Sequence, residues 1–460
     1  LPTNPKEADI EALYTIGSIG SVAQTDDSDI DYWVCINKKK LSKNSLNLLE
    51  LKLNMMEQYA REHFRIQITF FIVDITEAQQ NNFGGSTTES SGSAQALLLK
   101  EEFYRTMIHV AGKLPLWSVL PTTVSKAFYS PIFRVIASFP NLARYIDLGD
   151  IHTIPAGEFF GATVWQLFKG LKSPFKSVIK IALLEKYIHD AGQKPLLCNS
   201  VKDEWMNSGV NLRLAQNDSY YIMLKNMIRY YESKEDTESV WMLLTCFFLK
   251  LGIPDDAAVD KSIFGLRGML LSKCLDRWRW SKDKLYKTGR YKSWPYKNIA
   301  RLSVMIESFL IKKYKIINSI FSSSKQGNIM ISPVDRTVLG RKIYSELSRR
   351  PGKVSKVLLI SGRDAHFHSL HLNHAESPDH GAGWELISGH AKARQSADTI
   401  LQVKHIEEIG AWLLLNRIYH KSLVLNLVPN PTRITADDLR ELFNAMYDHL
   451  APAIQRAVHF

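Results

Sequence analysis

The chain has 460 residues, of which 45% are hydrophobic and 23% charged, a composition typical of a globular protein that can bury the cores of two or three domains. Its longest apolar run, residues 240–249, is too short to cross a bilayer, and no secretory leader opens the chain, so we expect a cytoplasmic protein. The formal net charge of +12 favours an anionic partner without choosing among a nucleotide, a nucleic acid and a membrane surface.

Residues 1–120 are expected to form a mixed α/β region. Apolar and β-branched runs predict strands at 12–16, 30–36 and 65–74. Between the second and third strands, apolar residues recur every three or four positions, which predicts a helix over 44–64. A segment rich in Gly, Ser and Thr follows at 81–95, and it is either a lid that closes over a ligand or an ordinary surface loop.

Helical patterns dominate the next region, residues 121–316. The pattern begins earlier, in the stretch 97–112, and is strongest at 173–188. In the second of these stretches Ser173 is a suitable N-cap, and Pro174 stands in the first turn, where its missing N–H costs no hydrogen bond. We expect this helical region to complete a site formed by the α/β region before it.

The C-terminal region, residues 317–460, returns to mixed α/β character. Apolar runs predict strands at 356–360 and 422–428, and residues 434–450 predict a helix capped by Thr435. The chain begins with Leu1 and not with Met, so an N-terminal stretch is expected to be missing from the first region.

The segment 28–35, which reads SDIDYWVC, places Asp29 and Asp31 at the start of an apolar strand. Residues two apart share one face of a strand, and at roughly 3.3 Å per residue their backbones lie about 7 Å apart. Two carboxylates at this spacing can share divalent ions, and Mg²⁺ favours a few carboxylates together with substrate phosphates. Upstream, Gly17 and Ser18 form a turn after a strand, where free backbone N–H groups attract phosphate.

A strand, a Gly-Ser turn and a second strand with Asp-x-Asp resemble the core of the polymerase-beta-type nucleotidyltransferases. Each motif alone is weak, because a Gly-Ser pair is common and Asp-x-Asp is more often a solvated turn. Their order between two apolar strands favours the functional interpretation. Enzymes of this type use two metal ions to activate an attacking hydroxyl and to stabilise the departing pyrophosphate.

A longer resemblance is to the bacterial class I adenylate cyclases. It is carried by YTIGSIGSVAQTDDSDIDYWVC at 14–35, by LLLKEEFYRTMIHVAGKLPLW at 97–117 and by LGDIHTIPAGEFFGATVWQLFKGLKSPFKSVIKIALLEKY at 148–187. It returns at SPVDRTVLGRKIYSELSRRPGKV, residues 332–354. The resemblance implies conversion of ATP to cyclic AMP and pyrophosphate with Mg²⁺, or with Mn²⁺ in its place. It also implies a regulatory role for the C-terminal region, through a protein of the sugar phosphotransferase system.

The resemblance also implies which residues form the site. Asp29 and Asp31 would be the metal ligands and catalytic carboxylates, while Gly17, Ser18 and Ser28 would contact the triphosphate or support the metal site. Two further residues match the family in the same way. They are Trp33, which is equally well explained as a core aromatic residue, and Lys6, whose alignment is loose.

Basic residues on the predicted helices supply a second feature that suits a triphosphate. Lys176 and Lys180 are four residues apart on the helix that follows Ser173, so they share one face. A triphosphate needs such a cationic clamp, although the same pair could be an ordinary solvated helix face. Arg105 is a third candidate with less support.

One position departs from the pattern expected of a nucleotidyltransferase. These enzymes place a third carboxylate on the neighbouring strand, where this sequence has Gln67. Asp74 is an odd number of residues further on and is expected to face the other side of the strand. A missing carboxylate should lower the rate of hydroxyl deprotonation more than it weakens nucleotide binding. The sequence therefore predicts an impaired cyclase unless Glu101 or Glu102 compensates.

Two other functions remain open from the residues alone. The same fold could transfer a nucleotidyl group to a separate hydroxyl acceptor, or it could bind nucleotide as a sensor with little activity. Residues 277–297 interleave basic and aromatic side chains, but no base-reading motif accompanies them, so nucleic acid is the weakest candidate partner. The four cysteines are far apart and indicate reduced thiols, not disulfides or a zinc site.

Overall fold

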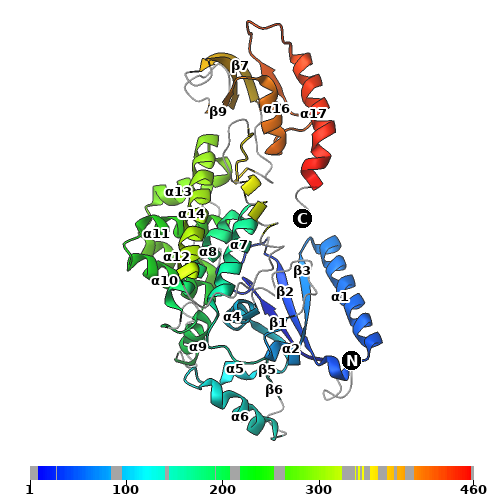
Figure 1. The fold of residues 1–460 in the computed structure, drawn as a ribbon, viewed down its shortest axis with the longest axis vertical. Coiled ribbons are helices and arrows are strands. Elements are labelled where there is room, and N and C mark those ends of the chain that lie inside the picture. Colours follow the sequence, from blue (N-terminus) through cyan, green and yellow to red (C-terminus); the bar gives the residue numbers. More distant parts are fainter. Residues whose placement is uncertain are drawn as a thin grey trace. The chain divides into compact units, whose positions relative to one another are not determined.

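The computed structural model of the chain describes residues 9–26, 28–83, 96–139, 144–191, 193–207, 218–252, 265–323, 337, 340–341, 344–346, 353–360, 370–377, 381–388 and 398–456. Lys6 and most of the loop expected at 81–95 lie outside this part. The chain divides into two compact units (Figure 1). The first contains Leu1–Gln166, Val178–Gly289 and Lys313–Arg336, and the second contains Leu167–Ser177, Arg290–Lys312 and Thr337–Phe460. The three regions expected from the sequence stay a prediction.

A four-stranded sheet with the order β3-β2-β1-β4 forms the centre of the first unit. Its strands are β1 (Ile10–Ile16), β2 (Ile30–Ile36), β3 (Ile68–Asp74) and β4 (Ile108–Gly112). Helix α1 (Lys43–Phe64) makes the crossover that allows β2 and β3 to pair in parallel, while β1 pairs antiparallel with β2 and β4. The three expected strands and the expected helix are confirmed, and β1 begins two residues earlier than predicted.

The fourth strand corrects the helix expected over 97–112. Helix α4 (Ala96–Thr106) ends before this strand, and the residues after it pair with β1, so that His109 lies opposite Tyr14. At the end of β4, Gly112 has φ +83°, and a Cβ there would lie 2.4 Å from the backbone oxygen of Glu11. Strand pairing and the close approach of two backbones determine that this segment is a strand, and the local periodicity of its sequence indicates neither.

Helices cover the two faces of this sheet with different residues. Leu53 of α1 packs against Val34 and Ile36 of β2 on one face. On the other face the ring of Trp33 stacks on Phe103 of α4, with ring centroids 4.2 Å apart. Because side chains alternate along a strand, Asp31 shares the face of Trp33 and lies on the side of the sheet that faces α4.

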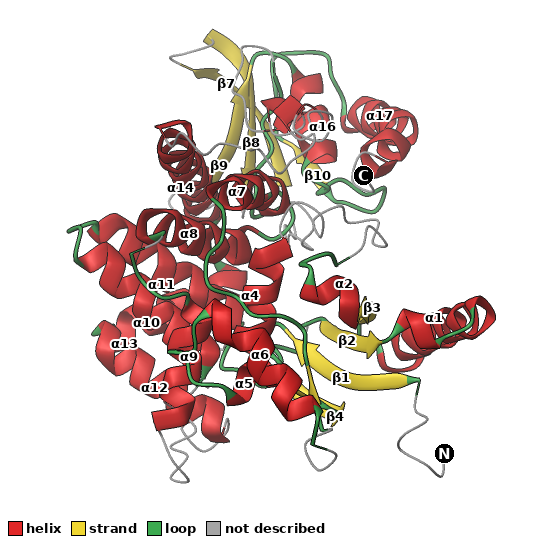
Figure 2. Ribbon diagram, turned by 60° about the horizontal axis from the view of Figure 1, so that its bottom comes forward, coloured by secondary structure: helices red, strands yellow, loops and turns green. Residues whose placement is uncertain are grey.

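Helices make up most of the chain between β4 and β7, as expected (Figure 2). The stretch predicted at 173–188 is helix α8. The other elements up to residue 323 are η2 (Lys38–Lys40), α2 (Ile75–Gln79), α4 (Ala96–Thr106), β5 (Leu114–Pro115), α5 (Leu116–Val119), α6 (Lys126–Ala137), β6 (Tyr145–Ile146), α7 (Ala156–Gly170), α8 (Pro174–Asp190), α9 (Leu197–Asn207), α10 (Ser219–Glu232), α11 (Thr237–Leu251), α12 (Gly265–Trp278), α13 (Lys282–Gly289), η5 (Arg290–Ser293) and α14 (Tyr296–Ser323). Within the described residues, none of the helices combines the length and apolar character needed to cross a bilayer.

A buried polar network ties four of these helices together in the first unit. Lys313 of α14 is fully buried, and its ammonium lies 2.8 Å from the carboxylate of Glu185 on α8 and 3.3 Å from that of Asp236, which caps α11. The hydroxyl of Tyr231 donates to the same Glu185 carboxylate at 2.6 Å. Buried charges are tolerated only when they are paired and hydrogen-bonded in this way. All four cysteines are buried free thiols.

The second unit contains another four-stranded sheet, with the order β10-β7-β8-β9. Its elements are β7 (Leu370–Ser377), β8 (Gly381–Ser388), β9 (Asp398–Val403), α16 (Ile406–Leu415), β10 (Leu425–Leu427) and α17 (Ala436–Arg456). Strand β10 and helix α17 confirm two predictions, and the hydroxyl of Thr435 accepts the N–H of Asp438 as a cap at 3.2 Å. The strand expected at 356–360 is wrong. Residues 358–360 form a turn, and the N–H of Val357 donates to the side chain of Asn416 instead of to a strand.

Candidate functional site

The two aspartates of the Asp-x-Asp motif lie where β2 begins. Ile16, the last residue of β1, is paired with Asp31 in the antiparallel register, so the end of β1 and the start of β2 form one edge of the sheet. Asp29 is exposed and directly precedes the strand. The N–H of Ile30 donates to the backbone oxygen of Gln67 at 2.9 Å, so the pairing with the third strand extends to this edge.

The register with β3 identifies the neighbours of the two aspartates. Thr69 lies opposite Asp31, and Gln67 precedes the pair formed by Ile68 and Ile30. Neither neighbouring position of β3 therefore supplies a carboxylate. Asp74 is buried at the other end of the strand, where it caps α2 and accepts the N–H groups of Glu77 and Lys38 at 2.9 and 2.7 Å.

The two serines expected at the site are brought together by the loop between β1 and β2. The side-chain oxygens of Ser18 and Ser28 are 3.3 Å apart. Ser28 is 8% exposed, and its oxygen also accepts the N–H of Thr25 at 2.9 Å. Ser28 therefore holds the loop closed, while Ser18 lies in the turn that follows β1.

Distant helices fix this loop in place. The N–H of Gly17, whose φ of +95° favours glycine, donates to the hydroxyl of Thr106 in α4 at 3.0 Å. The N–H of Val22 donates to the carboxylate of Asp218, the N-cap of α10, at 2.7 Å. Lys250 of α11 donates to the backbone oxygen of Ala23 at 2.6 Å. The loop is thus held by groups from three helices, and the Gly17 N–H is used in this anchoring.

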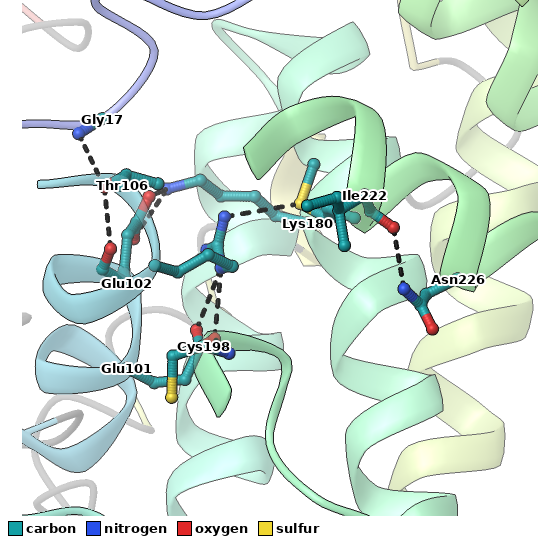
Figure 3. A network of polar contacts seen from close by, with 10 residues as sticks. Gly17, Glu101, Glu102, Thr106, Lys180, Cys198, Ile222 and Asn226 are labelled. Atoms are coloured by element: carbon teal, nitrogen blue, oxygen red, sulfur yellow. Dashed lines mark hydrogen bonds and ion pairs between the residues drawn. The ribbon is translucent and has the colours of Figure 1, made fainter. Parts of the chain in front are cut away.

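One ion pair lies beside the anchored turn (Figure 3). The hydroxyl of Thr106 donates to the backbone oxygen of Glu102 at 2.7 Å, and the Glu102 carboxylate lies 3.4 Å from the ammonium of Lys180. The carboxylate raises the pKa of Lys180 above its usual value. Lys176 lies one turn earlier in α8, in the part of the helix that belongs to the second unit.

Two further candidates from the sequence lie in the core. Trp33 is 2% exposed and is in ring contact with Phe103 and Phe83, so its burial favours the interpretation as a core aromatic residue. Arg105 is 4% exposed and pairs with Glu101 at 3.1 Å. Glu101 also accepts the N–H of Cys198 at 3.1 Å. Arg105 and Glu101 therefore satisfy each other inside the first unit, and the expectation that Arg105 faces a ligand is wrong.

The oxygen donors at this edge suit a divalent metal ion that arrives with a ligand. Asp29 and Asp31 offer two carboxylates, and Thr69 and Gln67 occupy the neighbouring backbone positions. Mg²⁺ is commonly bound by one or two carboxylates plus substrate phosphates, with water completing the shell. Across the described ranges, no group of three or more His, Cys, Asp or Glu is placed to hold a metal ion. The donors fit a shared metal better than a resident one.

Sequence reasoning missed the residues that anchor the loop, which are Thr106, Asp218 and Lys250. The only local signal was that Asp218 stands before an apolar helical stretch, as N-caps do. Burial raises the pKa of its carboxyl above the usual value, while the N–H groups that it accepts lower it. The contacts of Thr106, Asp218 and Lys250 with the loop join residues that are 89, 196 and 227 positions apart, so no spacing rule could have found these three residues.

Comparisons with known proteins point to one family. Residues 2–118 match the family described as "Adenylate cyclase NT domain", and residues 154–358 match "Adenylate cyclase, class-I, second domain". The adenylate cyclase of Escherichia coli (strain K12) is 30% identical over 356 residues, which are 76% of this chain and 41% of that protein. That of Proteus mirabilis is 31% identical over 76% of this chain and 40% of its own length.

The adenylate cyclase of Yersinia intermedia is 29% identical over 83% of this chain and 44% of its own length. The chain thus spans about two fifths of the length of the curated relatives that it matches. No solved structure matches it. The first matched segment contains the sheet edge and its loop, and the second contains α8 with Lys180.

Proposed function

The chain belongs to the bacterial class I adenylate cyclase family, and from that premise we propose that it converts ATP to 3′,5′-cyclic AMP and pyrophosphate. The observation that carries the proposal is the edge where β1 ends and β2 begins. Support comes from the pairing of Ile16 with Asp31 and from the 3.3 Å contact between the side-chain oxygens of Ser18 and Ser28, within the segment matched to the family's N-terminal domain.

We assign the metal and phosphate contacts as follows. Asp29 and Asp31 would hold two Mg²⁺ ions, for which Mn²⁺ could substitute, together with the phosphates of ATP. When bound, the metal would supply Lewis-acid chemistry that lowers the pKa of the ribose 3′-hydroxyl and neutralises charge on the phosphates. Ser18 donates a hydrogen bond to the triphosphate, and Lys180 supplies positive charge beside it. Lys176 and Lys6 remain proposed contributors to the same contacts.

The reaction requires an in-line geometry at the α-phosphorus. The 3′-oxygen forms a bond to this phosphorus, its proton passes to water, and the bond to the bridging oxygen breaks as pyrophosphate leaves with the electron pair. No carboxylate from β3 is available to take the proton, because Gln67 and Thr69 occupy the two neighbouring positions. We therefore propose a slow cyclase with ordinary nucleotide binding.

The wider setting follows from the same family. We propose that residues 1–120 form a polymerase-beta-type nucleotidyltransferase core, that the helices of 121–316 complete the nucleotide site, and that residues 317–460 respond to a regulator. A protein of the sugar phosphotransferase system is the proposed regulator, and the cytoplasm is the proposed location.

One alternative keeps the fold and loses the reaction. Gln67 at the position of the missing carboxylate favours a nucleotide-binding sensor with little or no turnover. Transfer of a nucleotidyl group to a separate hydroxyl acceptor is a further possibility that the reaction product decides.

The test is product analysis with ATP and Mg²⁺, and separately with Mn²⁺, for the unchanged chain, Asp29→Ala and Asp31→Ala. Equal amounts of cyclic AMP and pyrophosphate, lost in both variants, are expected. Metal-dependent ATP binding without any cyclic product would overturn the cyclase assignment and favour the sensor. A nucleotidyl adduct on an added acceptor would favour the transferase.

A further inference from the structure

The last turn of α4 directs two adjacent glutamates to different surroundings (Figure 3). Glu101 points into the first unit, where it and Arg105 form an ion pair whose side chains are 2% and 4% exposed. Glu102 pairs instead with Lys180 of α8, and these side chains are 26% and 46% exposed. Only the second pair is open to a solvent-borne ligand.

The open pair is connected to the turn that precedes the Asp-x-Asp motif. Thr106 accepts the N–H of Gly17 at 3.0 Å and donates to the backbone oxygen of Glu102 at 2.7 Å. Figure 3 shows Lys180 extending from α8 towards Glu102 and Thr106. The ammonium of Lys180 is therefore held close to the residues that begin the loop between β1 and β2.

The geometry of the pair is loose. The Lys180 ammonium lies 3.4 and 3.5 Å from the two carboxylate oxygens of Glu102, whereas a strong charge-assisted bond is about 2.7–2.9 Å long. Half-exposed pairs of this kind add little to stability. A polyphosphate carries several negative charges and can compete with a single, loosely held carboxylate for the same ammonium.

We propose that Lys180 is a polyphosphate-positioning residue that Glu102 holds beside the Gly17 turn until the triphosphate of the substrate displaces the carboxylate. The inference rests on the proposed function, because it takes ATP as the substrate and the Gly17 turn as part of its site. It adds that Glu102 competes with the phosphates, so that removing its charge strengthens phosphate binding.

The test measures binding of inorganic tripolyphosphate to the full 460-residue chain by calorimetry, without metal, and the KM for ATP with Mg²⁺. Lys180→Gln is expected to weaken tripolyphosphate binding and raise KM about 10- to 100-fold, the size of one charge-assisted contact. Glu102→Gln is expected to tighten tripolyphosphate binding severalfold. Lys180→Arg keeps the charge and is expected to stay close to the unchanged chain.

The matched control is Lys38→Gln. Lys38 pairs with Glu77 at 3.1 Å, and the two side chains are 42% and 39% exposed, so it is another open ion pair of the same unit. Its loss should leave tripolyphosphate binding within about twofold, as expected for a surface pair. An equal effect of Lys38→Gln and Lys180→Gln would overturn the inference, because general charge and not position would then explain it.

The exchanged variant, Glu102→Lys with Lys180→Glu, separates a structural pair from a positioning one. It restores opposite charges across the same contact, so full recovery of tripolyphosphate binding would overturn the inference, and failure to recover would support it.

The two proposals can also fail separately. If tripolyphosphate binding depends on Lys180 but no cyclic AMP forms, the proposed cyclase activity is contradicted and the proposed positioning role of Lys180 is supported. Cyclic AMP formation that is insensitive to Lys180→Gln would do the reverse.

Discussion

The two four-stranded sheets of this protein share one pairing pattern but differ in what they present. In each sheet an edge strand pairs in parallel, β3 with β2 and β10 with β7, and the other two pairings are antiparallel. In the first sheet, the long loop between β1 and β2 and the start of β2 gather polar groups at one edge. In the second, β7 and β8 are joined by a short connection that separates Ser377 from Gly381.

The carboxylates of the two sheets show the same difference. Glu385 of β8 lies opposite Asn373 and Gln402 on the neighbouring strands, and both side chains donate to its carboxylate. Asp31 lies opposite Ile16 and Thr69, next to a loop that three helices anchor. We therefore assign the proposed site to the sheet whose loop and strand ends gather polar groups, because the sheet topology alone specifies no chemistry.

The largest expected effect separates the two sheets directly. Asp31→Asn should lower cyclic AMP formation by about a thousandfold or more, equivalent to about 4 kcal/mol in the barrier, because the change removes a carboxylate that we propose as a metal ligand. Glu385→Gln should leave the rate unchanged, since its oxygens serve cross-strand contacts. Initial-rate measurements of the two variants side by side decide this. Equal losses would break the comparison.

The next expected effect concerns the free energy of unfolding and should be similar for one buried tryptophan in each unit. Trp33, on strand β2 of the first sheet, is 2% exposed, and Trp412, in the core of the second unit, is 1% exposed. Replacing either with Ala should lower the free energy of unfolding by about 3–5 kcal/mol, because each leaves a large cavity. Denaturant titration monitored by circular dichroism measures it. A loss under about 1 kcal/mol at Trp33 would contradict its role in the core.

A buried glutamate at the start of α4 should make the free energy of unfolding depend on pH. Glu158 accepts the N–H groups of Leu97 and Leu98, both at 3.0 Å, at the start of α4, and burial raises its pKa to about 7. The folded state therefore retains a proton that the unfolded chain releases near pH 4.5, and stability should fall as the pH rises from about 4.5 to 7.

The size of this effect follows from the shift in pKa. It should reach about 3 kcal/mol above pH 7, and Glu158→Gln should abolish that pH dependence. Unfolding titrations of the chain and the variant at pH 5 and pH 8 measure it. Parallel pH profiles for the two proteins would contradict the assignment.

The smallest expected effect concerns the strand next to the motif. Gln67→Glu would put a carboxylate at a position that the register places at the edge of the first sheet where we propose the site. We expect kcat to rise about tenfold, or about 1.4 kcal/mol, with little change in KM, because the added group would accept the proton of the 3′-hydroxyl. Steady-state kinetics test this. A fall in kcat would show that a third carboxylate at this edge does not assist the reaction.

Much of the fold and part of the site could be predicted from local sequence. The strands at 30–36 and the helix α8 follow from periodicity and caps, which depend only on residues a few positions apart. The Asp-x-Asp spacing and the odd separation of Asp74 from Gln67 are likewise local. The resemblance at 14–35, 97–117, 148–187 and 332–354 then identified the family, although no alternation or spacing rule contains that information.

Only the tertiary structure decided the rest. It made residues 108–112 a strand because β1 lies beside them, and it turned residues 358–360 because Ser303 and Asn416 accept backbone N–H groups there. It also placed Trp33 and Arg105 in the core and Lys180 beside Glu102. Each outcome depends on partners that are tens to hundreds of positions away, and the free energy of such contacts does not exist until the chain has folded.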